Sequence, residues 1–134
     1  MNIFIDTNIL ISAVLSSEGV PYQAFVRAVS FPNHGIVCEQ NIDEMRRIFR
    51  RKFPQKIQAL ETFLSLALLT LEVVPIPPKE HISEEKIRDR NDRPILRAAI
   101  FAKAHILLTG DKDFLESGLH KPKIMSAAEF VKKL

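Results

Sequence analysis

Short apolar runs that alternate with helical segments most constrain the fold of this chain. Each run is too short for a helix and contains few polar residues, which is typical of a strand buried on both faces. Segments with helical spacing of apolar residues separate the runs, and this order predicts a mostly parallel sheet covered by helices on both faces. The strands are expected at Asn2–Ile5, Gly35–Cys38, Leu71–Val74, His105–Thr109 and Lys123–Met125.

The segments between these runs carry signals for the beginning and end of helices. Pro21 suits the first turn of a helix, and Ser126 with Glu129 forms a capping-box pattern before the last helix. The proline-rich stretch 75–78 ends a strand and begins a loop. Helices are expected at Thr7–Leu15, Tyr22–Val29, Glu39–Lys52, Pro54 to about Thr70, Arg93–Lys103 and from Ser126 onward, with a short helical turn at Asp111–Glu116.

Length and composition favour one ordinary globular domain spanning residues 1–134. The chain has 134 residues, 46% of them hydrophobic, which is enough for a real core. The single Cys38 excludes an internal disulfide framework and favours a reducing, cytoplasmic setting. The apolar beginning lacks a basic stretch and is interrupted by Asp6, so it does not resemble a signal peptide, and no run is long enough to predict a membrane span.

Four acidic residues are expected to meet at one edge of the sheet. Asp6 directly follows the first strand, and Asp111 follows the His105–Thr109 strand. Glu44 lies in the first turns of the helix after the second strand, and Asp92 begins the helix that leads into the His105–Thr109 strand. Right-handed crossovers between parallel strands place all four at the carboxyl edge, where open α/β sheets bind ligands.

Each acid also has an ordinary structural explanation. Asp6 and Asp92 could cap helices, Glu44 could lie on the surface, and Asp111 could belong to a turn. Their coincidence at one edge favours chemistry, because clustered carboxylates repel one another unless a cation neutralises them. An all-oxygen ligand set suits Mg²⁺ or Mn²⁺. Three polar neighbours could hold the carboxylates in place: Thr7, Asn8 and Thr109.

Basic residues flank the proposed acids and are candidates for contacts with phosphate. They cluster on the Glu39–Lys52 helix and around Asp92, although solvated helix faces would explain them equally well. The net charge is only +3. The residues expected to contact a nucleic-acid backbone are Arg47, Arg51, Arg93 and Lys112.

Four motifs together resemble the PIN-domain family, and most closely its VapC-like toxins of prokaryotic toxin–antitoxin pairs. The motifs are FIDTNIL, a Glu in the third helix, DRPILRAA and LLTGDKDF. The resemblance implies a three-layer α/β/α sandwich with a central, mostly parallel sheet of about five strands, and a metal-dependent ribonuclease. By position, Asp6, Glu44, Asp92 and Asp111 match the family's acidic quartet, and Asp113 matches a nearby supporting acid. Two ambiguities remain, since Asp89 could share the role of Asp92, and Asp43 adjoins Glu44.

The expected activity is hydrolysis of RNA phosphodiester bonds with Mg²⁺ or Mn²⁺. An antitoxin partner is implied by the resemblance, and the apolar stretches Arg93–Lys103 and Phe63–Leu71 favour a homodimer. A structure-specific DNA nuclease and a non-catalytic nucleic-acid-binding domain are the alternatives. A phosphatase with a nucleophilic Asp is disfavoured, because Asn8 stands where its second Asp is needed.

Overall fold

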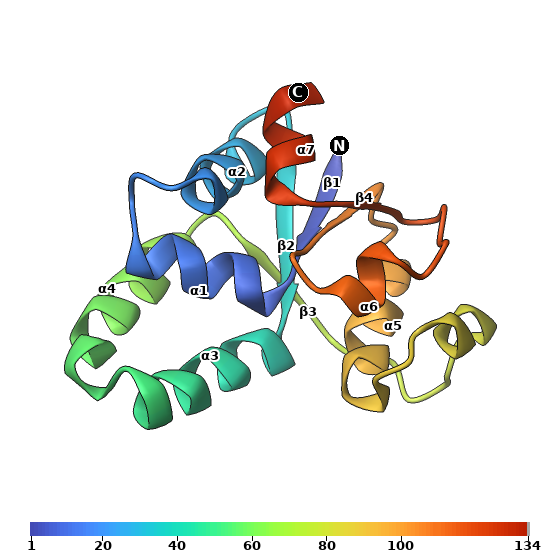
Figure 1. The fold of residues 1–134 in the computed structure, drawn as a ribbon, viewed down its shortest axis with the longest axis horizontal. Coiled ribbons are helices and arrows are strands. Elements are labelled where there is room, and N and C mark those ends of the chain that lie inside the picture. Colours follow the sequence, from blue (N-terminus) through green and yellow to red (C-terminus); the bar gives the residue numbers. More distant parts are fainter. Residues whose placement is uncertain (134) are drawn as a thin grey trace.

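The computed structural model describes residues 1–133, except for the side chain of Lys133. Its five strands form one parallel sheet in the order β3-β2-β1-β4-β5 (Figure 1). All five strands occur where the apolar runs predicted them, within one residue at each end. Their bounds are β1 Asn2–Ile5, β2 His34–Cys38, β3 Glu72–Val74, β4 Ile106–Leu108 and β5 Lys123–Met125.

Seven α-helices connect or follow these strands. The two helices at Thr7–Leu15 and Glu39–Lys52 begin and end as predicted. The predicted capping box before the last helix is also present: the Glu129 carboxylate accepts from Ser126 N–H, and the Ser126 hydroxyl accepts from Glu129 N–H. The helices are α1 Thr7–Leu15, α2 Val20–Val29, α3 Glu39–Lys52, α4 Ile57–Ala67, α5 Arg93–Phe101, α6 Lys112–Leu115 and α7 Ala127–Lys133.

Three predicted helices differ from the structure by two residues or more at an end, and the first of them, α2, begins at Val20 rather than Tyr22. The helix expected from Pro54 begins as a separate 3₁₀ turn, η1 Pro54–Lys56, and α4 ends at Ala67 because the next residues form tighter turns, such as the bond from Thr70 N–H to the Ala67 carbonyl. The helix expected to reach Lys103 ends at Phe101, since Lys103 has φ +56° and turns the backbone away.

The segment between β3 and α5 is more ordered than the expected loop. It contains two single-turn helices, η2 Ile82–Lys86 and η3 Arg90–Asp92. None of the helices in the described part is long and apolar enough to cross a membrane alone; α1 and α2 meet that test only as a pair bent by 115°.

Helices cover both faces of the sheet, which confirms the three-layer α/β/α sandwich. Successive strand residues point to opposite faces, so Ile3 and Ile5 pack against one core while Phe4 packs against the other. The first core includes residues of α1, α2, α3, α4 and α7, and the second is covered by α5 together with Phe114 of α6. Figure 1 shows these two groups of helices on opposite sides of the strands.

The strand order reverses at β1, which lies between β2 and β4. The carboxyl ends of the strands, and the beginnings of α1, α3 and α5, face the lower edge of the molecule in Figure 1. The beginning of β1 and the end of α7 lie at the opposite edge. The carboxyl ends of β1 and β4 are therefore the position at which open α/β sheets usually bind ligands.

Candidate active site

Asp6 lies directly after β1 and is only 6% exposed. Its backbone N–H donates to the Leu108 carbonyl of β4 at 2.9 Å, which continues the pairing of the two strands. Both carboxylate oxygens have partners: Oδ1 accepts from Thr7 N–H at 2.8 Å, and Oδ2 accepts from the Thr109 hydroxyl at 2.8 Å and from the Asn8 amide at 3.4 Å. Asp6 therefore caps α1 and at the same time joins β1 to the end of β4.

Asn41, which the sequence analysis did not single out, completes this buried hydrogen-bond network. Its side-chain N–H donates to the Thr7 hydroxyl at 2.9 Å, and its oxygen accepts from Cys38 N–H at 2.8 Å. The spacing of Cys38 and Asn41, at the N-cap and third position of α3, was the available signal. We refer below to Asp6, Thr7, Asn8, Asn41 and Thr109 as the Asp6 network.

The loop after β4 is tied to the same network. Asp111 N–H donates to the Thr109 hydroxyl at 3.0 Å, and Gly110 N–H donates to the Asn8 side-chain oxygen at 2.9 Å. Asp111 in turn caps α6, because its Oδ1 accepts from Asp113 N–H at 2.9 Å. The beginning of α6 is thereby held against the beginning of α1.

The charges around Asp6 show which acids it faces. Burial raises the pKa of Asp6 to about 6, the hydrogen bonds from Thr109 and Thr7 oppose this rise, and the negative charges of Glu44 and Asp111 add to it. Glu44 accepts a hydrogen bond from the Gln40 side chain at 2.9 Å. The structure thus places Glu44 near Asp6, whereas its neighbour Asp43 is exposed and lines a different groove.

Asp92 connects Asp6 to a second set of acids. The pKa of Asp92 is raised to about 8, and burial is the largest cause. The smaller causes are a hydrogen bond with the Asp111 carboxyl and the negative charges of Asp111, Asp6 and Asp89. Its side chain does not cap α5, unlike the expectation for an ordinary N-cap residue. The structure therefore brings together all four predicted acids, Asp6, Glu44, Asp92 and Asp111, at one edge of the sheet.

Three acids form a compact group in front of this edge. Asp89, Asp92 and Asp113 each offer one carboxylate oxygen, and these oxygens lie within 4.8 Å of one another. Asp89 also caps η3 by accepting from Asn91 N–H at 2.9 Å, and Asp113 forms an ion pair with Arg88 at 2.8 Å. We call Asp89, Asp92 and Asp113 the outer acidic group.

The donor set fits a hard divalent cation. Every candidate ligand is a carboxylate oxygen, the ligand type that Mg²⁺ and Mn²⁺ prefer in proteins. Burial is the main cause of the raised pKa values of Asp6 and Asp92, and the negative charges of neighbouring acids add to the rise, so these acids also oppose one another's ionisation. A bound cation would relieve this opposition, so the residues present suit the predicted metal.

A groove passes the acids between α3 and the beginning of α5. Arg47 borders this groove and also a second one beside β3. Arg51 and Lys112 are exposed, while Arg93 donates from Nε to the Ile87 carbonyl at 3.0 Å. The binding of substrate by Arg47, Arg51, Arg93 and Lys112 stays a prediction. The first groove is lined by Gln40, Glu44, Arg47, Asp89, Arg90, Asn91, Asp92 and Pro94.

Comparisons with known proteins agree with this fold. The family model of the PIN domain matches residues 2–113. A crystal structure of VapBC2 from Rickettsia felis bound to a DNA fragment from their promoter is similar, with a TM-score of 0.70 and 18% sequence identity over 94% of this chain and 98% of that chain. No curated protein matches the sequence.

Proposed function

Because this chain belongs to the PIN-domain family, a family of nucleases, we propose that it is a metal-dependent endoribonuclease and the toxin of a toxin–antitoxin pair. The observation that carries the proposal is the convergence of Asp6, Glu44, Asp92 and Asp111 from four segments at the switch point of the sheet. The proposed nuclease domain spans residues 1–134, and the single Cys38 supports a cytoplasmic setting.

The carboxylates of the quartet would hold Mg²⁺ or Mn²⁺, with Asp89 and Asp113 beside them. The cation would lower the pKa of a water molecule and offset negative charge on the scissile phosphate. The chain's own contribution is positioning: Thr7 N–H and the Thr109 hydroxyl fix both oxygens of Asp6 before any ligand arrives. The overall reaction would be phosphodiester hydrolysis that leaves a 5′-phosphate and a 3′-hydroxyl.

A single-stranded RNA backbone is the proposed substrate of the groove. Arg47 borders the groove on the α3 side, and Arg93 lies at the beginning of α5 beside Asp92. Arg51 and Lys112 would extend the positive rim on either side. Contacts of this kind go to phosphates and supply affinity without reading the base sequence.

The partner proteins in the proposal are an antitoxin and a second copy of the chain. The similar structure is a VapBC2 assembly bound to promoter DNA, which supports a cognate antitoxin here. Large apolar side chains at the end of α4 and on α5 support a homodimer, since Leu66 is 64%, Leu69 81% and Phe101 54% exposed.

The first test compares RNA with single-stranded DNA, each with Mn²⁺, Mg²⁺ or EDTA. The purified protein, Asp6→Asn and the matched control Asp43→Asn are incubated with both substrates. RNA cleavage that requires metal, is lost in Asp6→Asn and persists in Asp43→Asn would support the proposal. Preferential cleavage of DNA would instead identify a DNA nuclease, and binding of RNA without cleavage of either substrate would indicate a non-catalytic domain.

A further inference from the structure

The segment that carries Asp89 and Asp92 has few anchors. Between residues 78 and 91 only two residues are buried, Glu84 and Ile87. Ile87 is fully buried in the apolar core under α5, as expected for its side chain. Glu84 is also buried, with only 3% of its surface exposed. A glutamate is rarely buried to this extent without a partner for its charge.

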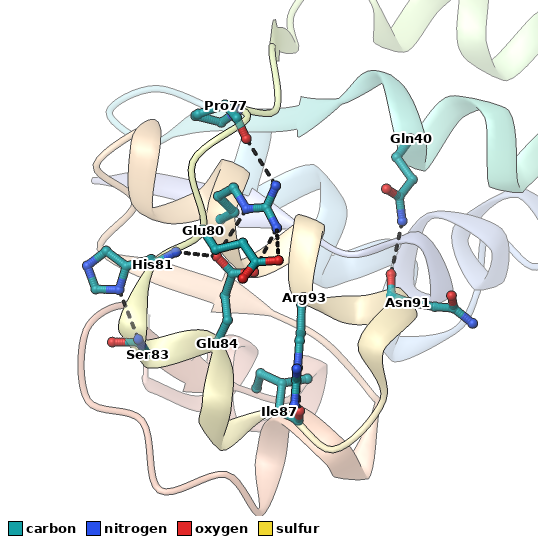
Figure 2. Close-up of polar contacts among 10 residues, drawn as sticks. Gln40, Pro77, Glu80, His81, Ser83, Glu84, Ile87, Asn91 and Arg93 are labelled. Carbon is teal, nitrogen blue, oxygen red and sulfur yellow. Dashed lines mark hydrogen bonds and ion pairs between the residues drawn. The ribbon is translucent and has the colours of Figure 1, made fainter.

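Arg97 of α5 is that partner. Its Nε donates to Glu84 Oε2 at 3.0 Å and its second terminal nitrogen to Oε1 at 2.9 Å, while the remaining nitrogen donates to the Pro77 carbonyl at 3.1 Å. The Arg97 side chain is only 15% exposed. Figure 2 shows Pro77, His81 and Glu84 gathered in this network, with His81 N–H donating to the Glu84 carboxylate.

We propose that Arg97 is a positioning residue, which holds Asp89 and Asp92 against Asp113 through its buried ion pair with Glu84. The inference rests on the proposed function of this acid site. It assigns to Arg97 a role in metal affinity, although its guanidinium does not touch the acids.

The path from the ion pair to the acids is short. Ile87 N–H donates to the Glu84 carbonyl, and the Ile87 carbonyl accepts from Arg93, one helical turn before Arg97 on α5. Two arginines of one helix therefore fix the segment at two successive points. From there the chain reaches Asp89, whose carbonyl accepts from Asp92 N–H at 3.1 Å.

Ile87 and the Arg93 bond to its carbonyl hold one point of this segment. Further contacts, of Arg88 with Asp113 and of Gln40 with the Asn91 carbonyl, each involve an exposed residue. The ion pair supplies a second, directional anchor, since a bidentate arginine–carboxylate contact fixes orientation as well as distance. The pKa of Glu84 is lowered by its hydrogen bonds with Arg97, in agreement with a paired, ionised state. Loss of Arg97 would leave a buried charge without its partner, which drives the segment toward water.

A matched ion pair elsewhere in the chain provides the control. Arg46 of α3 and Glu61 of α4 form the same bidentate contact, with distances of 3.1 and 3.0 Å. Their side chains are 42% and 43% exposed, and they connect two helices that do not carry the outer acidic group. A variant at Arg46 therefore removes a contact of the same bidentate geometry, at a more exposed position, without releasing Asp89 or Asp92.

The test compares Arg97→Met with Arg46→Met in the full chain. The first readout is amide hydrogen exchange at Asn91 and Asp92, measured without metal, and the second is the apparent Kd for Mn²⁺ from thermal shifts. We expect faster exchange and about 10-fold weaker Mn²⁺ binding in Arg97→Met, the lower end of the effect of residues that support metal ligands. Arg46→Met should match the wild type in both readouts.

A milder variant keeps the test decisive if Arg97→Met does not fold. Arg97→Lys retains the charge but loses the bidentate geometry, so a smaller change in the same direction is expected. Wild-type exchange and Mn²⁺ affinity in the folded Arg97 variants would overturn the inference. A wild-type protein that shows no Mn²⁺ shift would overturn the proposed function, while the exchange measurement would still decide whether Arg97 positions the acids.

Discussion

The Asp6 network and the outer acidic group are both clusters of polar side chains, but they are built differently. The Asp6 network lies at the ends of β1 and β4 and the beginning of α3, and each of its side chains has a hydrogen-bond partner within the chain. The outer acidic group lies on η3, the beginning of α5 and the short α6, where its carboxylates face one another. Hydrogen bonds within the chain hold every side chain of the first cluster, whereas the second brings three carboxylates together with one ion pair, from Arg88 to Asp113.

This difference teaches where rigidity and adaptability lie in the proposed site. Regular elements hold the Asp6 network, so its geometry should change little when metal binds. The outer acidic group depends on an irregular segment with two buried anchors, so its geometry should respond to mutation and to metal. Five predictions test or sharpen this contrast.

The largest expected effect separates Asp6→Asn from Asp113→Asn. Loss of the Asp6 charge should reduce metal-dependent RNA cleavage about 1,000-fold, which corresponds to the several kcal/mol that a positioned cation supplies. Asp113 already forms an ion pair with Arg88, so its loss should cost only about 10-fold or less. Single-turnover cleavage rates at saturating Mn²⁺ measure both. Equal losses in the two variants would show that the contrast does not hold for activity.

The second-largest expected effect is on the free energy of unfolding, which should depend more on the Asp6 network than on the outer acidic group. Asn41→Ala leaves the Thr7 hydroxyl and Cys38 N–H without their buried partner, which should lower the free energy of unfolding by about 1–3 kcal/mol. Asn91→Ala is the control, because Asn91 is exposed and alanine retains its backbone bonds to Asp89 and Gln40. Urea denaturation of the metal-free proteins measures the difference. A similar stability for both variants would contradict the assigned role of Asn41.

The pH dependence of the metal-free protein should reflect both clusters. Asp6 has a pKa of about 6 and Asp92 of about 8 in the folded chain, against an ordinary value of 3.8, so the folded state retains protons that the unfolded state has released. Stability should therefore fall as pH rises from about 4 to 8. Melting temperatures in EDTA should fall by several degrees, and less so in Asp92→Asn at pH 6–8 and in Asp6→Asn at pH 4–6.

Added metal should reverse this trend. In the proposed site Mn²⁺ would bind the ionised carboxylates, so its stabilising effect should be larger at pH 8 than at pH 5.5. Melting temperatures of the wild type at both pH values, with and without Mn²⁺, measure the reversal. An equal Mn²⁺ shift at both values would argue against carboxylate ligation by Asp6 and Asp92.

The smallest expected effect concerns the rim of the groove. Arg47→Ala should weaken RNA binding a few-fold and reduce the slope of log K against log salt by about one, as expected for one lost phosphate contact. Lys56→Ala removes the same charge from the η1 turn, which does not line the groove, and is the control. Fluorescence anisotropy with labelled RNA in Ca²⁺ buffers of different salt concentration gives both slopes. Identical slopes in the two variants would remove Arg47 from the proposed substrate contacts.

Most of the sheet and of the Asp6 network was predictable because local pattern and global fold agree there. The short, continuous apolar runs around Ile3, Ile36 and Leu107 are typical of strands buried on both faces, and the structure buries them. Parallel topology then predicts that the residues after β1 and β4 lie at the same edge of the sheet, and the pairing of these two strands in the structure makes Asp6 and Thr109 direct partners. The confirmed three-layer fold follows from the same argument.

The segment from Pro75 to Asp92 was not predictable in the same way. Its two single-turn helices have no repeating apolar pattern, and its main anchor is a charged pair, Glu84 and Arg97, separated by 13 positions along the chain. A buried Glu and a buried Arg look like surface residues in sequence until their contact is known. The grouping of Asp89 with Asp113 depends on this segment and was therefore left open.

The ends of the fold have a practical consequence for measurement. β1 begins and α7 ends at the edge of the sheet opposite the acids (Figure 1). A biotin or fluorophore attached near Met1 or through the end of α7 would keep the edge with the proposed site facing solution. Such an orientation allows single-molecule recording on an immobilised protein, in which RNA is delivered from the bulk and reaches the groove without obstruction by the tether.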